Sequence, residues 1–162
     1  MFFLKKLPTE SVLREFAHRY PEMRVSNVLA CLHLLRVASE LLRKLEEHFR
    51  ESHLSLARFL ALIVLEREDA RQLKCIEMTE ALGISKPNMT RLLESLEVDA
   101  LIERRQSKED KRSSLIAITR KGSKMVAAAL PGYYRITNKA MEPLDGPSKN
   151  LLIELLGRVE IE

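Results

Sequence analysis

The chain has 162 residues, a formal net charge of +4, 46% hydrophobic residues and 31% charged residues. This balance describes one globular domain, or two small ones joined closely, with a core that needs no disulfides or metal. No apolar run approaches the ~20 residues of a membrane span, and the first residues do not have the order of a signal peptide. We therefore expect a cytoplasmic protein that does not engage a membrane.

Helical periodicity dominates the first part of the chain. Apolar residues recur at helical spacing over residues 9–20, and a long amphipathic helix is predicted over residues 21–52. A helix of that length usually needs a partner over part of its surface. Residues 56–66, which Ser55 is expected to cap, are apolar enough for a central core helix. A polar connection is expected over residues 67–74.

A helix-turn-helix pattern follows. The spacing predicts a short helix over residues 75–82, with Gly83 just past its end, and a second helix over residues 86–99. Ser85 stands where a helix N-cap belongs. The apolar face of the second helix contains Met89, Leu92, Leu93 and Leu96, and its polar face contains Lys86, Asn88, Arg91 and Ser95.

A hairpin is predicted next, with strands over residues 101–105 and 114–118 and a turn over residues 107–112. In the second strand, Leu115 and Ala117 should point one way, and Ile116 and Ile118 the other. These are the two strands that the sequence predicts.

Two helices are expected to complete the chain. Thr119 caps a helix that runs to about residue 144, in which Pro131 and Gly132 should cause a kink or a break. Residues 145–147 form a turn, and Ser148 is the expected cap of a last helix over residues 149–161.

Charge is concentrated around the hairpin. Residues 101–124 contain eight Lys or Arg against three Asp or Glu. A basic stripe on a nearly neutral body indicates a polyanion partner, and a solvated charged face is the alternative reading of charge alone. The bases are Arg104, Arg105, Lys108, Lys111, Arg112, Arg120, Lys121 and Lys124.

A helix-turn-helix followed by a basic hairpin is what a winged-helix DNA-binding protein needs. Arg91 can pair bidentately with guanine and Asn88 with adenine. Contacts to phosphate, which position the helix without reading sequence, suit Ser85, Lys86 and Thr90. For Ser85 a helix cap is a complete alternative explanation.

The chain resembles the MarR/SlyA family of winged-helix transcriptional regulators. The resemblance is carried by residues 78–85, 89–97 and 101–104, and by the run from Asp110-Lys111-Arg112 to Ile118-Thr119 and Gly122. It implies a mainly α fold with a small β-wing, in which residues 53–122 form the DNA-binding lobe. Residues 1–52 and 123–162 would then supply dimerisation helices.

The resemblance also implies roles for the turn of the hairpin. In the family the Arg of Asp-x-Arg enters the minor groove and the Asp holds it in place, which assigns Arg112 and Asp110 here. A narrow minor groove has enhanced negative potential that favours such an Arg. Lys108 and Lys111 complete the wing contacts, and an ordinary exposed ion pair is the alternative.

Two positions depart from the family pattern. Ala100 stands where the family usually has Gly before the wing. A left-handed backbone there would cost roughly 1 kcal/mol with Ala, so we expect the helix to end differently in this chain. The second departure is Pro131-Gly132, which interrupts a helix that is often continuous in the family.

Cysteine and histidine give little sign of chemistry. Cys31 has apolar neighbours and is expected to be a buried, inert thiol, and Cys75 lies near a helix start. A zinc site at His48 and His53, beside Glu47 and Glu51, is not favoured because the spacing does not bring the ligands to one helical face. We expect no metal and no cofactor.

The interpretation is therefore a homodimeric, sequence-specific regulator that binds a pseudo-palindromic operator in double-stranded DNA. The resemblance implies a repressor that a small aromatic or anionic effector releases. Two alternatives remain: a redox regulator of the same fold that uses Cys31 or Cys75, and a winged-helix module for protein or RNA. An enzyme is not favoured, because no nucleophile elbow, phosphate loop or metal-ligand cluster is present in the sequence.

Overall fold

The computed structural model describes residues 6–106 and 114–161. In these residues the chain is mostly helical, with one three-stranded antiparallel sheet, which confirms the predicted class. The chain divides into two compact units, Met1–Leu45 and Glu46–Glu162.

The first unit contains α1 (Glu10–Arg19) and most of α2 (Val25–Glu51), which continues into the second unit. Thr9 caps α1, since its Oγ1 accepts the N–H of Val12 at 3.4 Å. Leu13 is buried. Half-exposed apolar side chains recur four residues apart along one face of α1, at Val12, Phe16 and Tyr20.

The apolar surface of α2 is largely uncovered. Leu34, Leu35, Val37 and Leu42 are each 40–50% exposed. By length and composition, α2 alone among the described helices is apolar enough to cross a membrane, which the short apolar runs of the sequence did not lead us to expect. Because α2 buries so little of this surface within the chain, it has the character of a helix that another surface covers.

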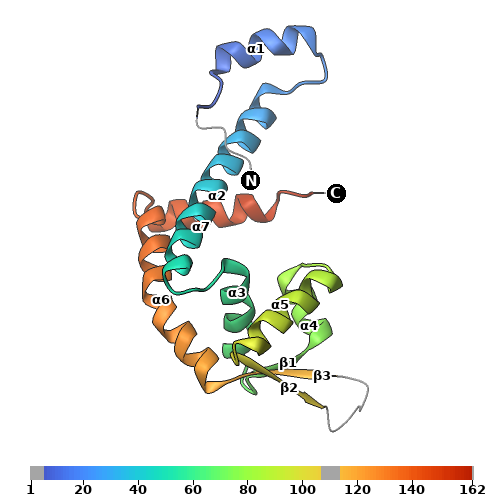
Figure 1. Cartoon of the computed structure of the whole chain (residues 1–162). Helices are drawn as coiled ribbons and strands as arrows, with labels where there is room; N and C mark the ends of the chain where they lie inside the picture. The colour runs from blue at the N-terminus through green and yellow to red at the C-terminus, as the bar shows by residue number, and fades with distance from the viewer. Residues whose placement is uncertain (1–5, 107–113, 162) are drawn as a thin grey trace. The chain divides into compact units, whose positions relative to one another are not determined.

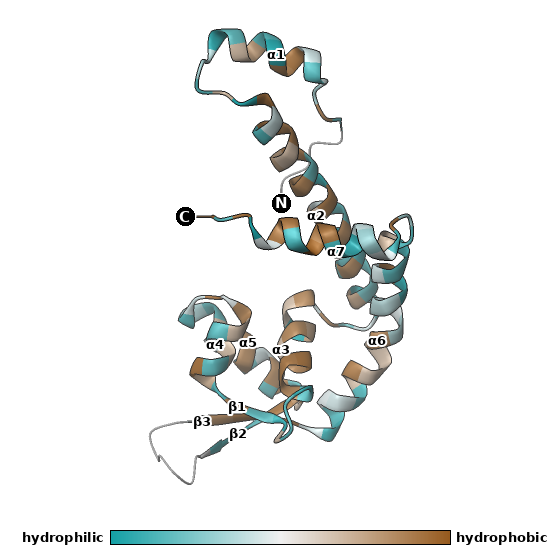
Figure 2. Ribbon diagram, turned by 180° about the vertical axis from the view of Figure 1, so that it is seen from behind, coloured by the Kyte–Doolittle hydropathy of each residue, from teal (hydrophilic) through white to brown (hydrophobic). Residues whose placement is uncertain are grey.

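The core of the second unit forms around α3 (Leu56–Glu66). Ser55 caps this helix as predicted, with its Oγ accepting the N–H of Arg58 at 3.2 Å. Five apolar side chains of this largely brown helix in Figure 2 are buried, namely Phe59, Ala61, Leu62, Val64 and Leu65. Phe49, at the end of α2, stacks on Phe59 with ring centroids 4.4 Å apart, and Tyr133 lies 5.3 Å from Phe59. The end of α2, α3 and the middle of α6 (Arg120–Met141) therefore share one core.

The sheet has three strands where two were expected. Strands β1 (Gln72–Lys74), β2 (Ile102–Gln106) and β3 (Ser114–Ile118) lie in the order β1-β3-β2. Strand β1 forms at the end of the segment that was predicted to be a polar connection. In the central strand Ile116 and Ile118 are buried, and so is Ala117, which was expected to point to the opposite face. Gln72 of β1 and Glu103 of β2 lie directly opposite Ala117, one on each side, and so share its face of the sheet.

Helices α4 (Cys75–Leu82) and α5 (Lys86–Val98) pack with α3 over the sheet (Figure 1). Their order and bounds match the predicted helix-turn-helix. Met78 from α4 and Met89, Leu93 and Leu96 from α5 are buried in the shared core.

Helix α6 (Arg120–Met141) continues through Pro131, so of the kink or break that was predicted there, the break is wrong. Proline removes one backbone donor from the helix, and the packed neighbours hold the remaining turns. Gly132 is buried, and the ring of His48 occupies the space that a side chain would need.

Helix α7 (Gly146–Gly157) begins one turn earlier than predicted, because Asp145 and not Ser148 is its N-cap. Oδ1 of Asp145 accepts the N–H of Ser148 at 2.9 Å. The side-chain and backbone hydrogen bonds from Ser148 hold the pKa of the Asp145 carboxyl below its ordinary value. None of the residues of α7 is buried, and its apolar side chains are half exposed or more at Leu151, Ile153 and Leu155.

Candidate nucleic-acid interface

The turn between α4 and α5 has the geometry of a helix-turn-helix. The backbone N–H of Lys74 donates to Oε2 of Glu77 at 2.7 Å, which fixes the first turn of α4. Gly83 ends this helix in the left-handed region at φ 60°. A Cβ at Gly83 would meet nothing within 4 Å, so glycine suits this position through its backbone freedom rather than its size.

Helix α5 presents two distinct faces. Met89, Leu93 and Leu96 are at most 1% exposed. The opposite side consists of exposed polar and basic residues, namely Ser85, Lys86, Asn88, Thr90 and Arg91. The predicted inward and outward faces are therefore confirmed, with Leu92 half-buried. What the outward residues bind stays a prediction.

The exposed side chains of α5 are little used inside the protein. In the described part of the chain, the side chains of Lys86, Asn88 and Arg91 form no ion pair or hydrogen bond. Thr90 Oγ1 donates to the carbonyl of Lys86 at 3.1 Å and keeps its acceptor capacity. Exposed polar side chains without partners on one helix are suited to an external partner.

Ser85 does not behave as the predicted cap. It occupies the N-cap position, but its side chain makes no capping hydrogen bond. A cap bonds the N–H of the second or third helical residue, and here the second is Pro87, which has none. The hydroxyl of Ser85 and the first backbone N–H groups of α5 consequently face outward without a side-chain cap.

Helix α5 ends in a Schellman motif whose left-handed residue is not glycine. Ala100 has φ 54°. Its N–H donates to the carbonyl of Glu97 at 2.8 Å, and the N–H of Leu101 donates to that of Leu96 at 2.9 Å. The expectation that the helix would end differently is wrong: the motif is retained, and alanine carries the conformational cost.

Part of the basic stripe serves the fold. Nε of Arg104 donates to Glu97 at 2.9 Å, Arg105 pairs with Glu103, and Nζ of Lys121 donates to the carbonyl of Asp99 at 2.7 Å. Arg120 and Lys124 are exposed on α6. The predicted wing contacts Lys108, Asp110, Lys111 and Arg112 lie outside the described residues. The charge offered to a polyanion is thus smaller than the count of bases suggests.

The two cysteines differ in exposure. Cys31 is exposed, so the expectation of a buried thiol is wrong. Its apolar neighbours lie on the uncovered surface of α2 rather than in a core. Cys75 is half-buried as the first residue of α4.

The histidine expected at a helix end has a structural role. Nε2 of His48 donates to the carbonyl of Ala129 at 2.9 Å. Among the described residues there is no group of three or more His, Cys, Asp or Glu side chains that could hold a metal ion.

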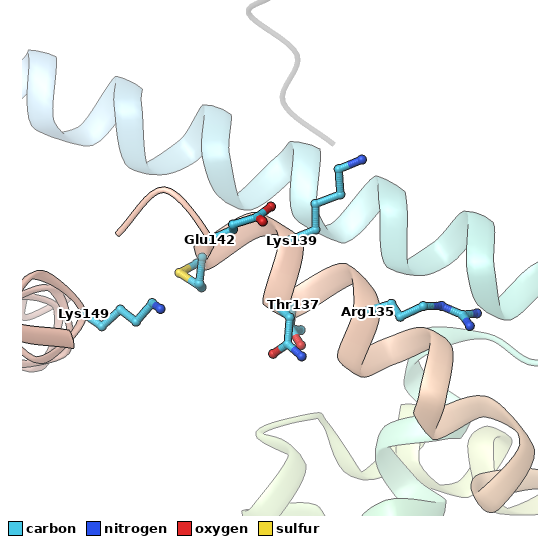
Figure 3. Close-up of a pocket in the computed structure, with 7 residues that line it drawn as sticks. Arg135, Thr137, Lys139, Glu142 and Lys149 are labelled. Carbon is cyan, nitrogen blue, oxygen red and sulfur yellow. The ribbon is translucent and has the colours of Figure 1, made fainter. Parts of the chain in front are cut away.

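A hollow beside α6 and the start of α7 is lined by three cations, which makes it a second place to look for an anion site. The structure does not bring these cations together. In Figure 3 the ends of Arg135 and Lys139 point away from Lys149. The outward face of α5 is therefore the stronger candidate for a polyanion.

The arrangement of α3, α4, α5 and the β2–β3 hairpin defines a winged helix-turn-helix protein. Residues 54–114 match the MarR family. The chain is 27% identical over 154 residues to the transcriptional repressor YetL of Bacillus subtilis, which covers 95% of this chain and 92% of that protein. It is also 27% identical over 148 residues to the transcriptional repressor MprA of Escherichia coli, covering 91% of this chain and 84% of MprA.

A solved structure shares the fold. Sco3205, a MarR family transcriptional regulator of Streptomyces coelicolor determined in complex with DNA, aligns with a TM-score of 0.79 and 18% identity over 83% of this chain and 85% of its own. The match over residues 54–114, the two repressors and the solved structure together support a MarR family winged-helix regulator.

Proposed function

We propose that the chain is a DNA-binding transcriptional regulator whose helix α5 enters the major groove. One observation carries this proposal: α5 buries one face in the core and offers on the other a set of polar and basic side chains that the described part of the protein leaves without ion pairs. The related repressors support it, as does the structural neighbour solved with DNA.

Within this proposal the residues of α5 divide by chemistry. Arg91 reads guanine and Asn88 reads adenine, because each can make two parallel hydrogen bonds to a base edge. Lys86, Ser85 and Thr90 contact phosphate and set the register of the helix. The uncapped N-terminus of α5 favours phosphate there, since its free N–H groups carry partial positive charge.

The wing supplies a second contact. We propose that Arg112 enters the minor groove, that Asp110 restricts its guanidinium, and that Lys108 and Lys111 bind phosphate. A narrow minor groove concentrates negative potential, which gives Arg an advantage at such a position.

The protein acts as a homodimer on a pseudo-palindromic operator in this proposal. The exposed apolar faces of α1, α2 and α7 supply the surface for a second copy. Two reading helices on half-sites one helical turn apart then bind together. Leu35→Glu on α2 and Leu155→Glu on α7 should yield monomers in sedimentation velocity, whereas variants that remain dimeric would place the interface elsewhere.

Repression is the mode we propose, following the named relatives, with a small aromatic or anionic effector that releases the DNA in the cytoplasm. No enzymatic step is needed for this role. A redox role for Cys31 or Cys75 is not favoured.

Fluorescence anisotropy of the protein on duplex DNA from upstream of its own gene tests the proposal, with an unrelated duplex as control. We expect selective binding, by ~10³ or more, that weakens steeply with salt. Arg112→Ala should lower both the affinity and the salt slope. Equal weak binding to a panel of duplexes covering the genome would contradict the proposed function, and an unaltered Arg112→Ala variant would contradict the wing contact alone.

A further inference from the structure

Helix α6 is fastened at two places along its length, and both belong to the second unit. Its first turn is bound to the end of α5, and its middle is bound to the end of α2. Each attachment includes a hydrogen bond to a main-chain carbonyl and a glycine that allows close approach. These two attachments connect α5, the proposed reading helix, through α6 to the end of α2 in the same unit.

The first attachment is centred on Thr119. Its Oγ1 donates to the carbonyl of Ala100 at 2.8 Å and accepts the N–H of Gly122 at 3.1 Å. The N–H of Thr119 donates to the carbonyl of Leu101 at 3.0 Å. The ammonium group of Lys121 donates a further hydrogen bond to the carbonyl of Asp99, which is the C-cap of α5. The end of α5 and the first turn of α6 are thus joined by several hydrogen bonds.

Close packing makes this attachment stiff. A Cβ at Gly122 would lie 2.3 Å from the carbonyl oxygen of Leu101 and 2.7 Å from Cγ1 of Ile118. The backbone of α6 therefore rests directly on the chain that leaves α5. A hydrogen bond from Ser123 Oγ to Glu66 at 2.6 Å holds the same turn against α3.

The second attachment lies near the middle of α6. His48 donates from Nε2 to the carbonyl of Ala129, and its ring occupies the place of a side chain at Gly132. The ring centroid is 5.2 Å from that of Phe49, which belongs to the core. A displacement of the end of α2 therefore acts on the backbone of α6 and cannot be taken up by a side chain rotating in solvent.

We infer that α6 is a rigid link through which the end of α2 sets the orientation of α5, with Thr119 and His48 as positioning residues. Thr119 and Ala129 are ten positions apart, which is about 15 Å along a helix. The end of α5 is also held by the buried side chain of Leu96 and by the ion pairs Arg58–Asp99 and Arg104–Glu97, in which the acidic partners are half exposed. The Arg104–Glu97 pair is exposed on both sides and contributes little, whereas Arg58 is only 18% exposed, so the main-chain attachment acts together with the Arg58–Asp99 pair.

This inference deepens the proposed function, since it rests on α5 being the helix that reads DNA. The experiment is a double-variant cycle on DNA affinity. His48→Phe keeps the ring and removes the donor, and Thr119→Val keeps the shape and removes the hydroxyl. We expect His48→Phe to change Kd at least fivefold when Thr119 is present, and less than twofold in the Thr119→Val background.

If the fold-changes in Kd caused by His48→Phe and Thr119→Val multiply in the double variant, within about twofold, the inference is overturned. Sites that do not communicate have additive free energies, and their fold-changes in Kd therefore multiply. Thr137→Val is the matched control. It also removes an α6 hydroxyl, which donates to the carbonyl of Tyr134 within the helix, and so it should leave the His48→Phe effect intact. The variant His48→Gln keeps a donor, because its amide can donate to the carbonyl of Ala129. We therefore expect it to bind DNA with wild-type affinity, unlike His48→Phe.

A second readout needs no DNA and so separates the link from the proposed function. In ¹⁵N spectra of His48→Phe, the link requires shifts at the amides of Leu101 and Thr119. Changes confined to residues 46–50 and 127–134 would overturn it. Shifts at Leu101 in a protein that binds no duplex selectively would uphold the link and refute the DNA-reading role.

Discussion

The imidazole of His48 lies so close to the backbone of Gly132 that a Cβ there would fall 2.0 Å from its Cε1. Glycine inside a helix costs about 0.5–1 kcal/mol relative to alanine. Here the packing of His48 against α6 requires glycine at position 132, although glycine is disfavoured inside a helix. This conflict makes position 132 a sensitive test of that contact.

Gly132→Ala should lower the free energy of unfolding by ~1–3 kcal/mol, because the ring must move out of a packed site. Helix propensity alone predicts the opposite sign. Urea unfolding followed by circular dichroism measures the change. Adding His48→Ala makes room for the methyl group, so the cost of Gly132→Ala should shrink in that background. A stabilised single variant would show that the ring does not occupy this space.

Ala100→Gly should stabilise the protein by about 1 kcal/mol. A left-handed backbone costs an L-residue roughly 1–2 kcal/mol, and the extra freedom of glycine in the unfolded chain returns part of this. The same unfolding experiment applies. Ala128→Gly, at an exposed site inside α6, is the control and should destabilise by about 1 kcal/mol. Destabilisation by both changes would mean that Ala100 is not left-handed in solution.

Lys86→Ala and Arg91→Ala should separate positioning from reading. Lys86→Ala should weaken operator and unrelated duplex alike and reduce the salt slope by about 1. For Arg91→Ala we expect a loss of ~1–3 kcal/mol on the operator, and little change on unrelated duplex. Anisotropy titrations at several salt concentrations measure both. Arg14→Ala, which removes an exposed arginine of α1, should leave DNA binding unchanged. Equal losses on both duplexes for Arg91→Ala would remove it from base recognition.

The cap of α7 should respond to acid. The pKa of Asp145 is lowered from its ordinary value of 3.8 by the side-chain and then the backbone hydrogen bond with Ser148. A depressed folded-state pKa adds stability above the unfolded-state value, and this stability is lost as the pH falls through the folded-state pKa. Asp145→Asn can cap the helix but cannot titrate. The melting temperature of the wild type should therefore fall relative to that of Asp145→Asn below pH ~4. A constant difference between pH ~6 and ~3 would show that the cap does not form.

The sequence predicted most of the fold because its signals are local. Ser55 and Thr119 cap the helices that they were expected to cap, and both hydroxyls accept the bonds that a cap requires. The apolar spacing of α5 also predicted which of its faces is buried. Such features depend on residues three or four apart, where the chain's own pattern decides the outcome.

The errors arose where distant residues decide. Strand β1 has three residues, too few for an alternating pattern, and it forms only because β3 pairs with it from 40 residues further along. Pro131 is accommodated within the packing of α6 rather than breaking it. Cys31 is apolar in its surroundings yet exposed, since its environment depends on what covers α2. The roles of the α5 side chains lie beyond the fold itself, because exposure alone does not name a partner.

Strand β1 also bears on how the protein behaves at high concentration. Unpaired strand edges invite pairing with other chains, and long apolar edges are the most dangerous. The apolar strand β3 is central, and the outer strands are either very short, as β1 is, or charged, as β2 is at Glu103, Arg104 and Arg105. Many copies gathered on one stretch of DNA would thus find no apolar β-edge to share in the described part of the sheet, which protects these strands against intermolecular aggregation.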